Sequence, residues 1–286
     1  IGNKGQLGWE LQRALPTLGD VCAVDFPQID LMDEAALGAL LNKEKPAILV
    51  NAAAYTAVDK AQSEPQSAFA INARAPEIMA RHCAETGALM VHYSTEYVYD
   101  GAKNSPYVET DAPAPQNEYG RSKLAGDQAV CASGARHLVL RTSWVYGSRA
   151  KNFLLTMLRL AKEGKDLRVV GDQRGTPTWC RTLAQATAQI LATTGNAAAF
   201  PSGVYHLSEL GETTWCGFAR AILENSADLR GYDLSRLKEI TTADYPTPAK
   251  RPKNSLLSKQ KLQDSFGVRL PHWEDSLRLV LDELCR

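Results

Sequence analysis

The chain lacks a long hydrophobic run, an excess of one charge and a high content of aromatic residues. Its 286 residues include 32 Lys and Arg against 32 Asp and Glu, and only 7% are aromatic. A general surface for nucleic acid or anionic membrane needs a basic excess, which is missing here. No apolar run reaches the roughly 20 residues that a membrane helix needs, and no signal peptide is recognisable. We therefore expect a soluble, cytoplasmic protein that binds neither nucleic acid nor membrane.

Cysteine is also sparse and scattered. The six cysteines form no C-x-x-C pair, and no histidine lies at metal-ligand spacing from them. Zinc sites and disulfide frameworks have regular cysteine spacings. We expect reduced structural thiols and no bound metal.

Short apolar segments alternate along the chain with segments of helical periodicity. The expected strands are 21–25, 47–51, 89–95, 137–144, 167–170 and 204–208. The expected helices, with apolar residues at three- and four-residue spacing, are 7–15, 34–43, 65–84, 119–132, 151–163, 180–193, 214–225 and 273–284. Continuous apolar strands separated by helices are typical of a parallel sheet covered on both faces. The pattern predicts a doubly wound α/β fold of the Rossmann type.

The alternation of strands and helices loosens after about residue 145. We expect a dinucleotide-binding domain at 1–147, to which 179–208 returns. A smaller substrate-binding lobe is expected from 148–178 and 209–286. The boundary between the two parts is therefore discontinuous in sequence.

The chain opens on a G-x-x-G-x-x-G turn formed by Gly2, Gly5 and Gly8. Glycines let the backbone approach a pyrophosphate, and the following helix offers free N–H groups. Asp25, about 20 residues on, can accept hydrogen bonds from an adenosine ribose. Its carboxylate favours a free 2′-hydroxyl, whereas Lys4 could pair with a 2′-phosphate, so NADPH and NADH both stay open as cofactors. A strand normally precedes such a turn, and we expect about half a dozen further apolar residues there in the natural protein.

Tyr119 and Lys123 lie at i and i+4 of an expected helix, so both project from one face. An ammonium beside a phenol favours the phenolate, and we expect Lys123 to lower the pKa of Tyr119 from about 10. The spacing alone is unspecific, because Tyr99 and Lys103 repeat it in a turn-like segment. Thr95 ends an expected strand, at the edge where parallel sheets bind ligands. Its hydroxyl can hydrogen-bond a carbonyl oxygen while the tyrosine supplies a proton.

Several segments together resemble the extended short-chain dehydrogenase/reductase family. They are the glycine turn, NAAAYTAVDKAQSEP, HYSTEYVYDG, YGRSKLAGD and RTSWVYG. DQRGTPT, YHLS and YPTPAKRPKNS extend the match to essentially the whole chain and indicate a branch that acts on dTDP-sugars. The resemblance implies NAD(P)H-dependent reduction of the 4-keto group of dTDP-4-dehydro-6-deoxy-L-mannose to dTDP-L-rhamnose, for polysaccharide biosynthesis.

The resemblance also implies roles for the matching residues. Tyr119 is the implied proton donor, and Lys123 its partner and a ribose contact. The implied substrate contacts are Thr95, Glu96 and Trp144. The implied dinucleotide contacts are Gly2, Gly5, Gln6, Leu7, Asp25, Asp30, Leu31, Ala54, Tyr55, Thr56, Tyr119 and Lys123. The family usually has Asp where this chain has Glu96, so the fit of the substrate there stays open.

Arg251 is a further candidate substrate contact. It lies between prolines in AKRPKNS, where a solvated charge is the alternative interpretation. Arginine suits a diphosphate better than lysine does, because its fork binds two oxygens at once.

Some members of the family are reported as dimers bridged by a metal bound to glutamates. Glu10 and Glu283 match two of those positions, but Arg181 stands where a third glutamate is expected. A fixed cation repels Mg²⁺. We therefore expect no metal-bridged dimer, and a monomer or another homodimer stays open.

Two other functions stay open. One is a nucleotide-sugar dehydratase or epimerase of the same fold. Dehydratases generally place two acidic residues after the threonine, whereas Tyr97 follows Glu96 here. The other is a non-catalytic NADP-binding regulatory subunit, which the retention of Thr95, Tyr119 and Lys123 opposes. A neighbouring deoxysugar epimer as substrate is not excluded either.

Overall fold

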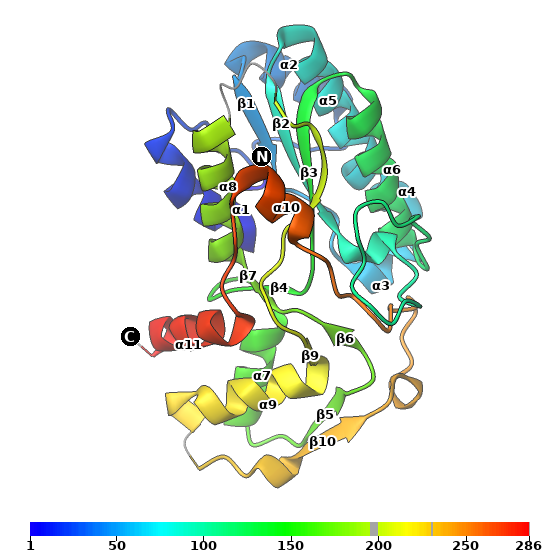
Figure 1. The fold of residues 1–286 in the computed structure, drawn as a ribbon. Helices are drawn as coiled ribbons and strands as arrows, with labels where there is room; N and C mark the ends of the chain where they lie inside the picture. Colours follow the sequence, from blue (N-terminus) through cyan, green and yellow to red (C-terminus); the bar gives the residue numbers. More distant parts are fainter. Residues whose placement is uncertain (195–199, 230, 286) are drawn as a thin grey trace.

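The centre of the molecule is a parallel sheet of four strands in the order β1-β2-β3-β8 (Figure 1). The computed structural model describes residues 1–194, 200–229 and 231–285. The strands are β1 (Ile48–Asn51), β2 (Leu89–Thr95), β3 (Arg136–Thr142) and β8 (Gly203–His206). β8 pairs with β3, so a segment from late in the chain forms the last strand of this sheet.

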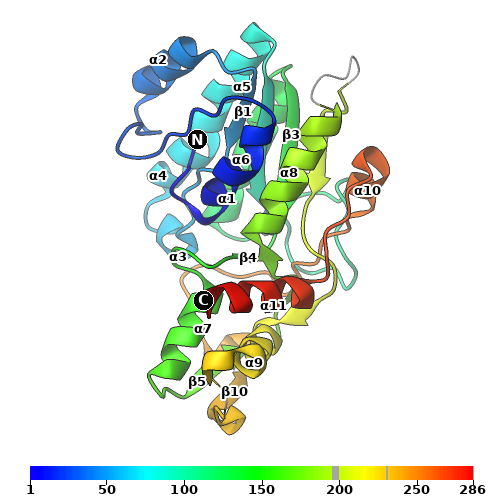
Figure 2. The same ribbon diagram turned by 90° about the vertical axis from the view of Figure 1, so that its left-hand side faces the viewer.

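Helices cover both faces of the sheet (Figure 1, Figure 2). One face carries α1 (Gln6–Ala14) and α8 (Cys180–Thr194). The other carries α2 (Glu34–Glu44), α5 (Ala75–Thr86) and α6 (Glu118–Ala132). The predicted doubly wound α/β fold is confirmed.

A hydrophobic core lies on each face of the sheet, and side chains of β2 alternate between these two cores, as the pleat of a strand requires. Leu89 and Val91 belong to the core on the α1 and α8 side, and Met90 to the core on the α5 side. Beyond Met90 the α6 side of β2 becomes polar, because His92 contacts the side chain of Lys123. The carboxyl end of the sheet therefore meets α6 through polar rather than apolar groups.

A smaller part of the molecule lies beyond the carboxyl ends of the strands (Figure 1). Its main elements are α7 (Phe153–Lys162), α9 (Trp215–Asn225), α11 (Trp273–Leu284) and the parallel pair β5 (Leu167–Val170) and β10 (Leu237–Ile240). Two short pairs accompany them, β4 (Val145–Tyr146) with β7 (Thr178–Trp179) and β6 (Arg174–Gly175) with β9 (Thr213–Thr214). α10 (Gln260–Phe266) lies apart from them, against β8 and α8.

Short helical segments complete the chain. Before α5 lie α3 (Val58–Ala61), α4 (Pro65–Phe69) and a π-helical turn (Ala70–Arg74). Short 3₁₀ turns occupy Leu15–Thr17, Glu96–Val98, Ala227–Leu229, Leu234–Arg236 and Thr242–Asp244.

The strand expected at 21–25 is wrong. Ile1 lies between this segment and β1, bonding Val50 O at 2.8 Å and accepting from Ala52 N at 3.0 Å. The segment receives a bond from Gly2 N to Val24 O at 2.9 Å. A strand needs a ladder of such bonds, but among the described residues ahead of α1 only Gly2 N and Asn3 N donate to the backbone of this segment, both to Val24 O.

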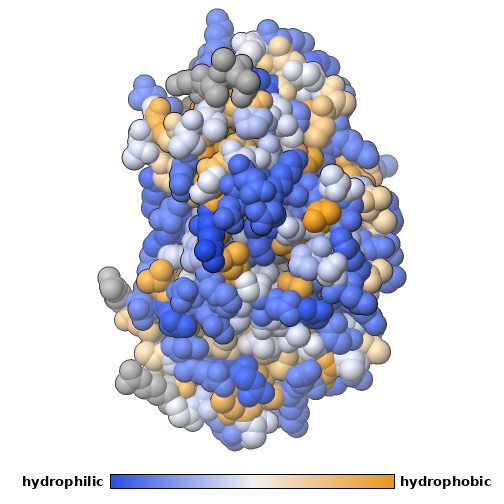
Figure 3. Space-filling view, in the orientation of Figure 1, coloured by the Kyte–Doolittle hydropathy of each residue, from blue (hydrophilic) through white to orange (hydrophobic). Residues whose placement is uncertain are grey.

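In the described ranges, no helix is both long and apolar enough to cross a membrane. The face shown in Figure 3 is mainly hydrophilic, with hydrophobic residues dispersed in small groups.

Candidate active site

Two of the three glycines in the turn, Gly2 and Gly8, leave no room for a side chain. Gly2 has φ of +89°, and a Cβ there would lie 2.5 Å from Ala53 N. A Cβ on Gly8 would lie 1.8 Å from Gly2 O. Gly5 precedes α1 without a side-chain cap, so the first amides of the helix stay available to a phosphate. These features fit the pyrophosphate of a dinucleotide.

Asp25 and Lys4 lie together beside this turn. Asp25 Oδ2 accepts a bond from Lys4 N at 2.9 Å, and Lys4 Nζ donates to Phe26 O at 2.6 Å. A carboxylate that can accept from a ribose hydroxyl thus lies beside an ammonium that can pair with a 2′-phosphate. Asp30 nearby is exposed and Leu31 half-buried. The arrangement is compatible with either nicotinamide cofactor.

The segment after β1 is held by a residue that the sequence analysis missed. Asn72, fully buried in the π-helical turn, accepts from Tyr55 N at 2.8 Å and donates to Tyr55 O at 3.1 Å. It thereby fixes the backbone between Ala54 and Thr56. π-helical turns often occur at functional sites. No spacing in the sequence indicated that Asn72 would reach this segment.

The remaining two predicted cofactor contacts belong to α1. Gln6 Oε1 accepts a bond from Asn152 Nδ2 at 2.9 Å, which ties the start of α1 to the residue that caps α7. Leu7 is buried in the core, so its backbone rather than its side chain is available to a ligand.

Thr95, Glu96 and Tyr119 meet at the carboxyl end of β2. Thr95 Oγ1 donates to Glu96 Oε2 at 2.8 Å and accepts from Tyr97 N at 3.2 Å. A Cβ on Gly120 would lie 2.3 Å from Tyr97 O, so a glycine is needed for α6 to approach this close. Burial is the main reason why the pKa of Tyr119 is raised; the Glu96 charge adds to it and the Thr95 side chain opposes it.

Our expectation that Lys123 lowers the pKa of Tyr119 is therefore wrong for this structure. Lys123 Nζ instead donates to Tyr93 O at 2.6 Å and lies 3.4 Å from His92 Nε2. Burial lowers the pKa of Lys123 to about 8, and the charge of Asp127 opposes that shift. The ammonium is directed at the strand rather than at the phenol.

Asp127 continues the column of Tyr119 and Lys123 by one more helical turn. Its Oδ2 accepts a bond from Arg141 Nε at 3.0 Å, and both side chains are buried. The i+4 spacing from Lys123 to Asp127 is visible in the sequence, but the sequence analysis did not use it.

Glu96 is a buried carboxyl group, only 4% exposed. Burial raises its pKa to about 7, and the hydrogen bond from Thr95 counteracts part of this shift. Glu96 therefore titrates near neutral pH beside the proposed proton donor.

Trp144 lies just after β3, in a left-handed conformation with φ of +46°. Its ring stacks on Trp215 of α9 with centroids 3.7 Å apart, and it lies so close to Gly175 that a Cβ there would be 2.3 Å from Trp144 Cε2. It is 9% exposed. Trp144 thus joins the end of the sheet to the smaller part of the molecule.

Arg251 is bound to a carboxylate that the sequence analysis did not consider. Its guanidinium forms two bonds of 2.9 Å to Asp59 of α3. Its predicted contact with a diphosphate therefore depends on the N–H groups of the guanidinium that do not bond Asp59.

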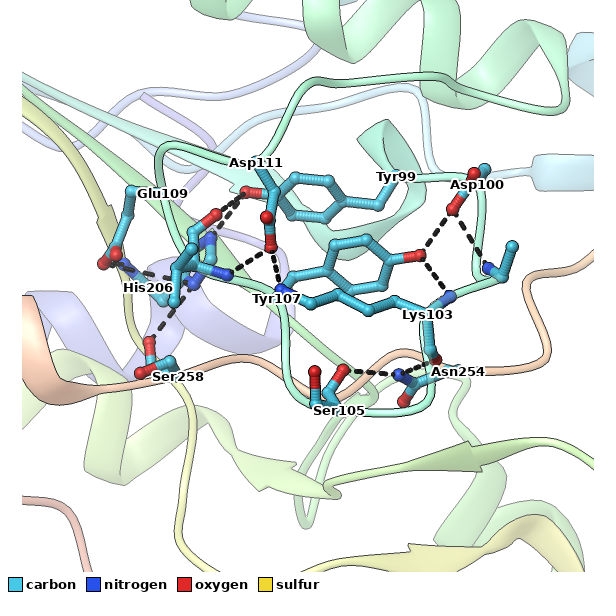
Figure 4. Close-up of polar contacts among 12 residues, drawn as sticks. Tyr99, Asp100, Lys103, Ser105, Tyr107, Glu109, Asp111, His206, Asn254 and Ser258 are labelled. Carbon is cyan, nitrogen blue, oxygen red and sulfur yellow. Dashed lines mark hydrogen bonds and ion pairs between the residues drawn. The ribbon is translucent and has the colours of Figure 1, made fainter.

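The pair Tyr99 and Lys103 has a structural role, as its turn-like context indicated. Tyr99 is buried, stacks on Tyr107 with centroids 4.3 Å apart and lies 2.8 Å from His206 Nε2 (Figure 4). Lys103 Nζ forms a 2.6 Å ion pair with Asp111 in the same view.

Arg181 lies between the two glutamates of the expected metal position. Its guanidinium bonds Glu10 at 3.1 Å through Nε and also bonds Glu283. The guanidinium of Arg181 therefore pairs with both carboxylates.

A family model described as "RmlD substrate binding domain" matches residues 1–286. The chain belongs to the RmlD family. A relative from Burkholderia thailandensis, named dTDP-4-dehydrorhamnose reductase, is 46% identical over 99% of this chain and 97% of its own length. The predicted resemblance to this group of enzymes is confirmed.

Solved structures of the RmlD family agree with the fold. A dTDP-4-dehydrorhamnose reductase from Clostridium acetobutylicum superposes with a TM-score of 0.91 at 35% identity, covering 100% of this chain and 98% of its own. The Bacillus anthracis reductase, solved in complex with NADP, gives 0.88 at 33% identity, covering 99% and 97%.

Proposed function

We propose that the protein is an NADPH-dependent reductase that converts dTDP-4-dehydro-6-deoxy-L-mannose to dTDP-L-rhamnose, with NADH as an alternative cofactor. The observation that carries this proposal is the meeting of Thr95, Glu96 and Tyr119 at the carboxyl end of β2. The relatives of the RmlD family, named as reductases of this substrate, support it.

The glycine turn and the segment after β1 would hold the cofactor. The free amides at the start of α1 suit its pyrophosphate, and Asp25 with Lys4 suits the adenosine ribose. Tyr55, fixed by Asn72, and Lys123 would lie along its nicotinamide half. When bound, the reduced cofactor supplies the hydride.

Tyr119 would give the proton to the sugar O4. Its raised pKa keeps the phenol protonated at neutral pH, which a proton donor requires. Thr95 would hydrogen-bond the same oxygen once its hydroxyl is released from Glu96. Lys123, anchored on Tyr93 O, would orient the ribose.

The smaller part of the molecule would bind the nucleotide sugar. We assign it residues 148–178 and 209–286, of which α10 lies against the cofactor domain, and the cofactor domain 1–147 with 179–208. Glu96, Trp144 and Arg251 would contact the substrate. The six cysteines are all free, which fits a reducing compartment, so we place the reductase in the cytoplasm.

The test is to mix the protein with NADPH and dTDP-4-keto-6-deoxy-L-mannose and follow the absorbance of the reduced cofactor. The proposal predicts one NADPH oxidised for each sugar consumed. Sugar turnover without net oxidation would indicate an epimerase or dehydratase instead. Tight cofactor binding without any turnover would indicate the regulatory subunit.

A further inference from the structure

Glu209 is a completely buried residue whose carboxyl group the proposed reaction does not use. It lies between β8 and β9, and its Oε1 atom is 2.7 Å from Thr182 Oγ1 and 2.6 Å from Ser276 Oγ. Thr182 belongs to the start of α8, which covers the sheet, and Ser276 belongs to α11 of the smaller part. The start of α8 lies beside α11 in Figure 2. Glu209 therefore connects the two parts of the molecule.

The hydrogen bonds around Thr182 indicate that Glu209 is protonated. Thr182 Oγ1 also lies 2.8 Å from Trp179 O. A threonine hydroxyl has one hydrogen to donate, and a carbonyl oxygen can only accept. If this hydrogen goes to Trp179 O, the hydrogen between Thr182 and Glu209 must come from the carboxyl group. The neutral acid thus satisfies the contacts with Trp179, Thr182 and Ser276 together, whereas a carboxylate leaves one of them without a hydrogen.

The surroundings of Glu209 also disfavour a negative charge. Within the described residues, Glu209 Oε2 has no hydrogen-bond partner, and no lysine, arginine or histidine pairs with the carboxyl group. Burial raises the pKa of Glu209 to about 8; the hydroxyls of Ser276 and Thr182 oppose this shift, and the charge of Asp275 adds to it. Burying an unpaired carboxylate is costly, so the neutral acid is the stable form at neutral pH.

The elements that pack around Glu209 carry other charged or titratable groups. These are Tyr146 of β4, Cys180 and Arg181 of α8, Glu212 before β9, His272 before α11 and Asp275 of α11. Burial raises the pKa of Tyr146 and of Cys180, so both stay neutral where Glu209 titrates. Arg181 pairs with Glu10 and Glu283, and Glu212 pairs with Arg174. The proton on Glu209 is therefore not replaced by a neighbouring cation.

The segment after Glu209 supports the turn that carries Trp144. Thr176 Oγ1 donates to Gly211 O at 2.7 Å. Two residues further on, Thr178 N donates to Trp144 O at 3.2 Å. A movement of Glu209 relative to α8 or α11 would therefore be transmitted to Trp144, a predicted substrate contact.

We propose that Glu209 is a positioning residue of the substrate site: as a neutral carboxylic acid it fixes the smaller part of the molecule to α8, and loss of its proton releases this contact. The inference rests on the proposed function, in which Trp144 contacts the nucleotide sugar. On deprotonation the O–H bond at Oε1 breaks and the proton passes to the solvent. Binding of the nucleotide should therefore weaken as the pH rises through about 8.

The experiment measures the Kd for dTDP by calorimetry on the full chain at pH 7 and pH 9. With a pKa of about 8, only about one-tenth of Glu209 stays protonated at pH 9, so Kd should rise about three- to tenfold. Glu209→Gln keeps the size of the side chain and cannot ionise, and its NH₂ group can donate to both hydroxyls. In this variant Kd should change less than about twofold. Titration of the ligand itself would appear equally in both proteins.

Asp275→Asn is the matched control, because it removes an exposed carboxylate next to Ser276 and leaves Glu209 in place. It should keep the rise in Kd. Ser276→Ala removes a hydrogen bond that lowers the pKa of Glu209, so the rise should move to higher pH. Equal Kd values at both pH values in the unaltered protein would overturn the inference. The same rise in Glu209→Gln, or a rise at lower pH in Ser276→Ala, would overturn it too.

Two measurements without a ligand separate this inference from the proposed function. The infrared difference spectrum between the unaltered protein and Glu209→Gln should contain the carbonyl band of a protonated acid at pH 7, and most of this band should be lost at pH 9. Amide hydrogen exchange of α11 at pH 9 should be faster in the unaltered protein than in Glu209→Gln. A failure of dTDP to bind at either pH would contradict the proposed function, whereas absence of the band at pH 7, or equal exchange, would overturn the role of Glu209.

Discussion

Thr95 Oγ1 donates its hydrogen bond to Glu96 Oε2 at 2.8 Å, at the buried end of β2. In this arrangement the hydroxyl proton of Thr95 is directed at a carboxylate rather than at a substrate. Protonation of Glu96 removes the charge that holds this proton and that raises the pKa of Tyr119. The state of Glu96 therefore controls two groups of the proposed reaction.

We predict that kcat falls as the pH rises through about 7, the value to which burial raises the pKa of Glu96. Below this pH the carboxyl is neutral and leaves Thr95 free to bond the sugar oxygen. Above it, the carboxylate binds Thr95 and makes Tyr119 a weaker acid. Glu96→Gln should remove this step from the pH profile of kcat. A step at the same pH in the variant would assign it to another group.

Tyr119→Phe should lower kcat by about 10²- to 10⁴-fold, the usual loss for a general acid. The ring and its contact with Tyr97 remain, so the Kd for NADPH should change little. Steady-state kinetics and calorimetry check the two parts separately. If the variant kept full activity, the proton would have to come from elsewhere.

Gly120→Ala tests whether α6 must approach Tyr97 closely. The new Cβ would lie 2.3 Å from Tyr97 O, so α6 must move and displace Tyr119. We expect a loss of kcat of at least about tenfold, since misplacement by about 1 Å can cost 10²-fold. Gly38→Ala in α2 is the control, because nothing lies within 4 Å of its new Cβ. It should keep kcat and raise the stability of the helix slightly. Equal kcat in both variants would mean that the approach of α6 is unimportant.

Mg²⁺ or EDTA should change neither Tm nor molecular mass in solution. Arg181 occupies Glu10 and Glu283, so a cation would have to displace a guanidinium. Arg181→Glu should reverse this by adding a third carboxylate, and Mg²⁺ should then raise Tm. Thermal unfolding and light scattering with and without the metal provide the check. A Tm that depends on Mg²⁺ in the unaltered protein would contradict this role of Arg181.

The spacing of apolar residues predicted the sheet and its helices. It reflects which face of each strand or helix is buried. It failed at 21–25, which has the apolar pattern of a strand but, among the described residues ahead of α1, receives backbone bonds only at Val24 O. It also left the partner of β5 unidentified, because β10 has two exposed positions in its four residues and resembles a loop.

Within the site, the sequence predicted which residues meet but not how they point. The helical spacing placed Tyr119 and Lys123 on one face, yet Lys123 bonds the carbonyl of Tyr93. Contacts such as Asp59 with Arg251 join distant segments, and no local pattern encodes them. The effect of Arg181 on this position could be predicted from the sequence. A cation in place of an expected carboxylate changes the charge of the position whatever the local geometry is.

The most direct test of the reductase is to follow deuterium from NADPH labelled at C4 of the nicotinamide, in each of its two epimers. NMR of the product sugar then shows where the label goes. We predict that one epimer delivers deuterium to C4 of dTDP-L-rhamnose and that the other does not. Product without deuterium at C4 from either epimer would contradict hydride transfer to that carbon.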